Sequence, residues 1–318
     1  MKNFILFNPG QSSLNLGDEI IEDSCKNVIK EKFGEQQYIS ISTHLPISNS
    51  YLRYIDNPEF KFVLGSNLLM SNMCGRFRQW DIKIWNRKVL KNTVLLGVGW
   101  HQYSRKANLY TKILYNSILS KTHMHSVRDE YTKKMLEAIG IKNVINTGCP
   151  TIWRLSKDVC KQIPKGKAKN VVFTLTDYNK DFENDKKIIQ ILEKNYENVY
   201  FWPQGRGDFK YLDDLKVQKN INVITPSLKS YDNMLETQNM DFVGTRLHGG
   251  IRAMQKGHRS IIIAIDNRAI EMSRDYNIPI LERNNVEDLE DMINSRFETK
   301  IQIPEDNIKK WKEQFNKN

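Results

Sequence analysis

Apolar and polar residues alternate along the chain in two recurring patterns. Short apolar runs predict buried strands, and longer stretches with apolar residues three or four positions apart predict amphipathic helices. In the first half we expect strands at 3–7, 37–41, 60–64, 93–98, 123–127 and 143–145, and helices at 18–33, 108–119 and 129–139. This order of elements favours an α/β domain built on a parallel sheet.

The same alternation resumes after a polar stretch. Residues 156–169 are rich in Lys and contain Pro and Gly, which is typical of a linker. Beyond them we expect strands at 170–175, 199–202, 221–224, 240–244, 260–265 and 278–281, and helices at 185–196, 228–237, 249–256, 269–276, 286–294 and 304–315. The sequence therefore predicts two Rossmann-like, doubly wound α/β domains, 1–157 and 158–318, facing a cleft. This architecture resembles that of GT-B enzymes, and the last helix can cross back to the first domain.

One predicted strand–helix–strand unit, from 240 to 265, carries the richest candidate chemistry. Its turn holds Arg246, His248, Gly249 and Gly250, and ligands of parallel sheets bind beyond the carboxyl ends of strands. Arg246 is suited to a two-pronged hydrogen bond with a phosphate or carboxylate, and His248 to proton transfer near neutral pH. A helix N-terminus at the glycine pair would attract an anion. The alternative is that His248 is a core or surface histidine without chemistry.

The turn after the first strand is a second candidate. Asn15 and Gly17 can contact a sugar or an anion, and Asp18 is expected to be the N-cap of the first long helix. A plain capping turn is an equally good interpretation. The turn matches neither a P-loop nor a GxGxxG fingerprint, so we infer no nucleotide from it.

Other polar residues follow the remaining predicted strands. Arg206 lies between two glycines in a loop typical of phosphate sites, or of an ordinary flexible loop. His101 is an alternative acid or base, or a structural residue, and Arg128 can hold an anion or pair with Asp129 or Glu130. The further candidates at strand ends are Gly65, Asn67, Gln204, Asn267 and Arg268.

The composition limits the classes of protein to which the chain can belong. The 318 residues, 40% of them hydrophobic, suit two globular domains. The apolar runs are shorter than a membrane span or a secretory signal needs, so we expect a cytoplasmic protein. Four scattered cysteines without Cys-x-x-Cys spacing argue against a metal site or a disulfide framework.

The net charge of +11 fits nucleic acid, an anionic membrane or anionic substrates. We favour a generally Lys-rich composition, because no basic run is interleaved with aromatic residues as a single-strand binder would require. Nucleic acid is therefore not expected as a partner.

Several short motifs occur in an order that resembles the polysaccharide pyruvyl transferase family over roughly residues 3–280. They are NLGD at 15–18, GSN at 65–67, GVG at 97–99, RDE at 128–130 and RLH at 246–248. The sequence departs from the family pattern at Cys149-Pro150, where Asp-Pro is frequent, and at 257–259, where Gly-x-Pro is frequent. Arg268 stands where the family has a lysine. These departures bear on the donor and acceptor and leave the fold intact.

The resemblance implies transfer of a pyruvate group from phosphoenolpyruvate to a sugar of a bacterial surface polysaccharide or its precursor, giving a ketal without cofactor or metal. The first domain would bind the acceptor and the second the donor. Arg246, Arg206 and Arg268 would bind the donor's anionic groups, and His248 would transfer a proton, with Asp18 as a further catalytic candidate. A lipid-linked acceptor would bring the enzyme to the inner face of the membrane, and homo-oligomerisation stays open.

Two other functions remain open from the sequence. A GT-B-like glycosyltransferase would use a nucleotide sugar at the same residues, although no pocket for the base and ribose is identifiable. A non-catalytic binding protein is the third interpretation, and the presence of both Arg246 and His248 argues against it.

Overall fold

The computed structural model describes residues 3–53, 58–104, 106–217 and 221–316. The chain forms two compact units. Unit 1 contains Met1–Ser13, Ile21–Pro150 and Ile303–Asn318, and unit 2 contains Leu14–Ile20 and Thr151–Gln302. The units thus differ from the expected ranges 1–157 and 158–318, because Leu14–Ile20 joins unit 2, Ile303–Asn318 joins unit 1, and the main boundary follows Pro150.

Unit 1 is built on parallel strands in the order β2-β1-β3-β4. These are β1 (Asn3–Asn8), β2 (Gln37–Ser42), β3 (Phe60–Leu64) and β4 (Thr93–Leu96). A parallel pair, β5 (His125–Val127) and β6 (Val144–Asn146), is connected to this sheet by a parallel bridge between Val98 and Val127. Strand order reverses between β1 and β3, as in doubly wound folds.

The helices of unit 1 are short apart from the first. They are α1 (Leu16–Phe33), whose first turn belongs to unit 2, α2 (Arg87–Leu90), α3 (Leu109–Ile118), α4 (Glu130–Ala138) and α12 (Glu305–Glu313), with 3₁₀ turns η1 (Asn49–Arg53) and η2 (Ile84–Asn86). A third 3₁₀ turn, η3 (Pro150–Ile152), lies where the chain passes from unit 1 to unit 2. Asn108 and Asp129 cap α3 and α4 by accepting N–H groups of the first turn. Helix α12 returns to unit 1, where Phe315 packs edge-on against Phe33, Phe60 and Phe62.

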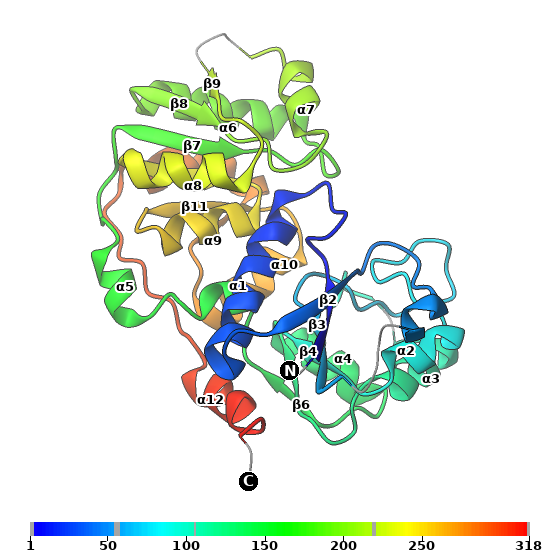
Figure 1. Ribbon diagram of the computed structural model, residues 1–318. Coiled ribbons are helices and arrows are strands. Elements are labelled where there is room, and N and C mark those ends of the chain that lie inside the picture. The colour runs from blue at the N-terminus through cyan, green and yellow to red at the C-terminus, as the bar shows by residue number, and fades with distance from the viewer. Residues whose placement is uncertain (1–2, 54–57, 105, 218–220, 317–318) are drawn as a thin grey trace. The chain divides into compact units, whose positions relative to one another are not determined.

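Unit 2 contains a six-stranded parallel sheet in the order β12-β11-β10-β7-β8-β9. Its strands are β7 (Asn170–Thr174), β8 (Asn198–Phe201), β9 (Ile221–Val223), β10 (Met240–Gly244), β11 (Ser260–Ala264) and β12 (Ile280–Glu282). From β7 the chain winds through β8 to β9 at one edge (Figure 1). It then crosses to β10, which pairs with β7 on its other side. This is the Rossmann strand order, with its switch point between β7 and β10.

The helices of unit 2 follow the strands along the chain. They are α5 (Lys157–Gln162), α6 (Phe182–Asn195), α7 (Asp208–Asp214), α8 (Leu228–Thr237), α9 (Leu247–Gln255), α10 (Asn267–Tyr276) and α11 (Leu289–Asn294), with the 3₁₀ turn η4 (Arg283–Asp288) before α11.

Every strand and helix predicted from the sequence is present, but three short helices, α2, α5 and α7, were not predicted. The expected linker 156–169 contains α5, which Ser156 caps by accepting the N–H of Val159. Helix α7 follows the loop with Arg206. Among the described residues, no helix combines the length and the apolar character needed to cross a membrane.

Candidate active site

Four loops of unit 2 leave the carboxyl ends of β7, β8, β10 and β11. The segment Leu14–Ile20 lies against one of them and belongs to the same unit. Strands β7 and β10 are neighbours whose connections run to opposite edges of the sheet. The residues that follow these two strands therefore occupy the place where open α/β sheets bind ligands.

Arg246 follows β10 and is buried among carboxylates. Its Nε donates to the carbonyl oxygen of Leu175 at 2.9 Å and to Oδ2 of Asp208 at 3.1 Å. Its Nη2 donates to Oδ1 of Asp177 at 3.1 Å and also to Oδ1 of Asp208. A side chain at Gly205 would overlap the guanidinium, so glycine is required there. The positive charge of Arg246 is thus neutralised by the protein itself.

This geometry corrects the expectation of a two-pronged contact between Arg246 and a substrate anion. The edge formed by Nε and Nη2 is already occupied, and the guanidinium carbon lies 5.2 Å from the centre of the Tyr178 ring. Within the described part of the chain, Nη1 makes no hydrogen bond. A ligand could therefore accept a hydrogen bond from Nη1 but not from the pair of nitrogens Nε and Nη2.

Asp208 organises the loops around Arg246, and sequence reasoning gave it no role. It is fully buried and accepts the backbone N–H groups of Gln204 at 3.2 Å, Gly205 at 2.7 Å and Asp177 at 3.1 Å. Burial raises the pKa of Asp208, and the charge of Arg246 opposes that rise. One carboxylate thereby connects the loops that follow β7, β8 and β10.

His248 lies buried in the first turn of α9. The helix begins at Leu247, two residues before the expected start at 249. Gly250 consequently donates its N–H to the carbonyl of Arg246 at 3.3 Å, inside the helix. The expectation that the glycine pair forms the open, anion-binding end of the helix is therefore wrong for Gly250, whose N–H is already bonded, and Gly249 lies within the first turn rather than at the start of the helix.

The two glycines serve packing instead. A Cβ at Gly250 would lie 2.6 Å from Cγ1 of Ile262, and one at Gly249 would lie 3.0 Å from Oε1 of Gln204. Glycine at both positions lets α9 approach the sheet and the Gln204 side chain.

The segment with the NLGD motif is held against the loop after β8 by Gln204. The Nε2 of Gln204 donates to Oδ1 of Asn15 at 3.0 Å, and the N–H of Leu16 donates to the carbonyl of Gln204 at 2.9 Å. A Cβ at Gly17 would lie 2.6 Å from that Nε2, so the glycine permits the contact. The Oε1 of Gln204 is buried, and no described residue donates to it.

Asp18 is not the N-cap that the sequence suggested. Helix α1 begins at Leu16, which makes Asn15 the preceding residue and places Asp18 in the first turn. Asn15 accepts the N–H of Gly17 at 3.1 Å and donates to Oδ2 of Asp18 at 3.3 Å. Asp18 supports the orientation of Asn15 from a buried position.

Arg268 and Arg206 are the two further cations of this site. Arg268 pairs with Asp266 at 3.0 Å and donates to the hydroxyl of Tyr178, whose ring centre lies 6.0 Å from the guanidinium carbon of Arg268 and 5.2 Å from that of Arg246. Asn267, beside it, has a buried Nδ2 that meets no acceptor among the described residues. The side chain of Arg206 is exposed and forms no ion pair within the described ranges.

The candidates between Gly65 and Arg128 lie in unit 1. Arg128 donates from Nη1 to Oδ1 of Asn67 at 2.9 Å and from Nε to Asp129 at 2.9 Å, so it pairs with Asp129 rather than Glu130. Asn67 in turn donates to the carbonyl of His101 at 2.8 Å. Gly65 has a φ of +46° and leaves no room for a side chain beside Ile21, so its role is in packing.

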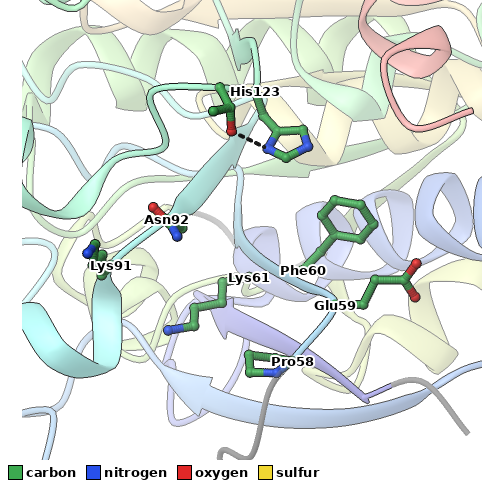
Figure 2. A pocket seen from close by; sticks show the side chains of 8 residues that line it. Pro58, Glu59, Phe60, Lys61, Lys91, Asn92 and His123 are labelled. Carbon is green, nitrogen blue, oxygen red and sulfur yellow. Dashed lines mark hydrogen bonds between the residues drawn. The ribbon is translucent and has the colours of Figure 1, made fainter. Parts of the chain in front are cut away.

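A cavity of about 270 Å³ lies elsewhere in unit 1 (Figure 2). Its lining comes from the amino ends of β3 and β4 and from the segment before β5: Pro58, Glu59, Phe60, Lys61, Lys91, Asn92, Thr122 and His123. Substrates of parallel sheets bind at the opposite ends of strands, so this cavity is not part of the candidate active site.

Comparison with known proteins connects these features to a family. A family model described as polysaccharide pyruvyl transferase matches residues 15–267, which include the NLGD and RLH motifs. No curated protein matches the chain in sequence.

Three solved structures show the same fold. The chain is similar to Methanocaldococcus jannaschii UDP-GlcNAc 2-epimerase in complex with UDP-GlcNAc and UDP, with 16% identity, a TM-score of 0.57 and 98% of each chain covered. It is similar to S. aureus MnaA with UDP, with 10% identity, a TM-score of 0.53 and coverage of 93% of this chain and 92% of that one. The third is a putative UDP-N-acetylglucosamine 2-epimerase from Listeria monocytogenes, with 11% identity, a TM-score of 0.54 and coverage of 98% and 90%.

At these identities the structural similarity establishes the fold alone, and it confirms the predicted α/β fold of GT-B type with parallel sheets. The family match covers most of the chain, and the family consists of transferases that act on sugars. The chain belongs to the polysaccharide pyruvyl transferase family.

Proposed function

We propose that the protein transfers a pyruvate group from phosphoenolpyruvate to two hydroxyls of one sugar, in a surface polysaccharide or its free or lipid-linked precursor. The observation that supports this most is the set of residues at the switch point of unit 2. Here Arg246 and Arg268 both lie near the Tyr178 ring, His248 follows Arg246 in the first turn of α9, and the loop after β8 adds the exposed Arg206. Phosphoenolpyruvate carries a phosphate and a carboxylate, and guanidinium groups bind both.

The reaction needs one proton donor and one proton acceptor. A proton is added to the methylene carbon of the donor, which makes the adjacent carbon electrophilic, and a sugar hydroxyl attacks there. Phosphate then leaves, and the second hydroxyl closes the ketal. The two sugar hydroxyls release two protons in all. One replaces the proton that was added to form the methyl group, and the other leaves with phosphate. We assign one of these transfers to His248 and need no resident cofactor for any step.

The arginines have different roles in this proposal. Arg206, which forms no ion pair within the described ranges, binds an anionic group of the donor, and Arg268 contributes a second cation beside its ion pair with Asp266. Arg246 is mainly a positioning residue, because Asp208 and Asp177 hold its charge. Gln204 and Asn15 present amide groups suited to sugar hydroxyls or to the donor carboxylate. The proposed reaction takes place in the cytoplasm.

A thermal-shift titration with phosphoenolpyruvate tests the donor. A ligand at a hundred times its Kd stabilises the folded state by about 2.7 kcal/mol. Arg206→Ala should weaken binding roughly 10- to 100-fold, because a hydrogen bond to a charged group contributes about 1.5–3 kcal/mol. Arg296→Ala is the matched control. This exposed arginine lies next to Phe297, whose backbone N–H donates to the carbonyl of Lys165. Because Lys165 precedes the amino end of β7, Arg296 lies away from the candidate site, which is at the carboxyl ends of the strands. Equal shifts in both variants would exclude Arg206 from the donor site.

His248→Ala should retain the shift with phosphoenolpyruvate and lose phosphate release from it in the presence of a panel of sugar acceptors. Retained binding shows that the variant is folded, and His248→Gln, which keeps a hydrogen-bonding group, provides the conservative comparison. Full phosphate release by a folded His248→Ala protein would remove His248 from the mechanism.

A nucleotide-sugar reaction is the second candidate, because two of the similar structures contain UDP or UDP-GlcNAc. UDP-GlcNAc is therefore titrated in parallel. A thermal shift with UDP-GlcNAc and none with phosphoenolpyruvate would favour a sugar-nucleotide enzyme over the pyruvyl transferase.

A further inference from the structure

The net charge of the chain is concentrated in one stretch. Residues 60–128 contain 12 Lys and Arg and a single acidic residue, Asp81. The whole chain has 48 basic and 37 acidic residues, which leaves 36 of each outside this stretch. The entire excess of +11 therefore lies within residues 60–128, and a uniformly Lys-rich composition does not explain it.

Helix α3 turns an apolar and basic face away from the core of unit 1. Its buried side carries Thr111, Leu114, Tyr115 and Ile118. At 100° per residue, Leu109, Lys112 and Ile113 lie on the opposite side. Leu109 is 72% exposed and Ile113 is 52% exposed, which is unusual for aliphatic side chains one helical turn apart.

The turn before α2 extends this surface. The N–H of Ile84 donates to the hydroxyl of Tyr110 at 3.1 Å, so η2 lies against α3. Helices α2 and α3 also pack side by side (Figure 1). Trp85 is 60% exposed on η2, and Nζ of Lys83 lies 4.9 Å from its ring. We define the α2–α3 face as Trp85, Arg87, Lys88, Leu109, Lys112 and Ile113.

The cations of the α2–α3 face are not neutralised by the protein. Among the described residues, Arg87, Lys88 and Lys112 form no ion pair, and Asp81 is already paired with Arg78 at 2.9 Å. Exposed lysines of unit 2 behave differently, since Lys187 pairs with two glutamates and Lys194 with Glu290. The positive field of the face is therefore available to an external partner.

We infer that the α2–α3 face docks on an anionic lipid surface. An exposed Trp with two aliphatic side chains suits the boundary between head groups and acyl chains, and the surrounding cations suit anionic head groups. A second copy of the chain would bring like charges together. Nucleic acid would use the cations but would leave Leu109 and Ile113 without a role. This inference does not depend on the reaction proposed above.

Flotation of the full-length protein with phosphatidylcholine vesicles, with and without phosphatidylglycerol, tests the charge requirement. We expect binding only to the anionic vesicles. Each cation near such a surface contributes about fivefold in binding, so Arg87→Ala, Lys88→Ala and Lys112→Ala together should lower partitioning by roughly two orders of magnitude at low salt. The control combines Lys169→Ala, Lys187→Ala and Lys194→Ala, which removes the same charge from unit 2 and should bind as the wild type does.

The apolar part of the face is tested separately. Ile113→Ser should weaken vesicle binding, whereas Val223→Ser, at a β9 position that is 49% exposed, should not. Of the other five tryptophans, Trp80, Trp100, Trp202 and Trp311 are buried and Trp153 is half-buried in unit 2, so a vesicle-induced blue shift that comes from the α2–α3 face should vanish in Trp85→Phe. Equal binding to neutral and anionic vesicles, equal loss in the two triple variants, or binding to random duplex DNA without binding to vesicles would overturn the inference.

Discussion

Replacing Gly250 with alanine distinguishes a packing role of this glycine from a ligand-binding role. The added Cβ would lie 2.6 Å from Cγ1 of Ile262 and 2.9 Å from Cε1 of Phe242. Both neighbours are fully buried in β11 and β10, so neither can move aside without disturbing the sheet. Overpacking of this kind costs about 1–3 kcal/mol, and two contacts below 3.0 Å place the cost near the upper end.

The helix itself partly offsets this cost. Alanine is favoured over glycine in a helix interior by about 1 kcal/mol. We therefore expect a net loss of about 1–2 kcal/mol in the free energy of unfolding, measured as a shift of the urea midpoint at unchanged slope. Gly166→Ala is the control, because a Cβ at that position meets no atom within 4 Å.

The two roles predict opposite patterns. If Gly250 serves packing, the midpoint falls in Gly250→Ala, stays near the wild-type value in Gly166→Ala, and the folded Gly250→Ala protein still binds phosphoenolpyruvate. An unchanged midpoint with loss of phosphoenolpyruvate binding would show that the backbone of Gly250 contacts the ligand, and it would refute the packing argument.

Two further predictions concern unit 1. His125 is buried, accepts the N–H of Leu95 and contacts the carbonyl of Ser120, and burial lowers its pKa to about 4. Because the folded pKa lies below the unfolded value near 6.5, about 3 kcal/mol of stability is present above pH 6.5 and is lost as the pH falls towards 4. Urea unfolding across this range should show that loss in the wild type and not in His125→Gln, and equal losses would refute it. Phe315→Ala should lower the free energy of unfolding by about 3–5 kcal/mol, because it removes the ring that packs on three phenylalanines. Phosphoenolpyruvate binding should not change, and an unchanged urea midpoint would contradict this prediction.

The fold was largely predictable because its long elements have strong periodicity. The buried strands of both sheets are continuous apolar runs, as parallel sheets covered by helices require. Helices α2, α5 and α7 were missed because helices of four to seven residues offer few positions at which a period can be recognised. The cap at Ser156 was the one local signal of α5, and it lay within a stretch whose composition indicated a linker.

The loops of the candidate site were predictable, and their internal contacts were not. Arg246, Gln204 and Arg268 follow β10, β8 and β11, as the pattern of strand ends predicted. The partners of Arg246, however, are 38 and 69 residues away in sequence, and a sequence pattern does not specify such pairings. The helix register at Gly249 and Gly250 was likewise set by close packing on β11, which outweighs the preference of glycine for turns.

The pairing of Arg246 with Asp208 bears on why an arginine belongs to the RLH motif. A buried ion pair adds little net stability, because desolvation of the two charges offsets their attraction. What this pair provides is fixed geometry. Asp208 accepts three backbone N–H groups and two groups of Arg246, and these donors come from the loops after β7, β8 and β10. Catalysis of a group transfer depends on loops that are positioned before the substrate binds. The arginine of the motif therefore contributes most by holding these three loops, and His248 beside it, in one arrangement.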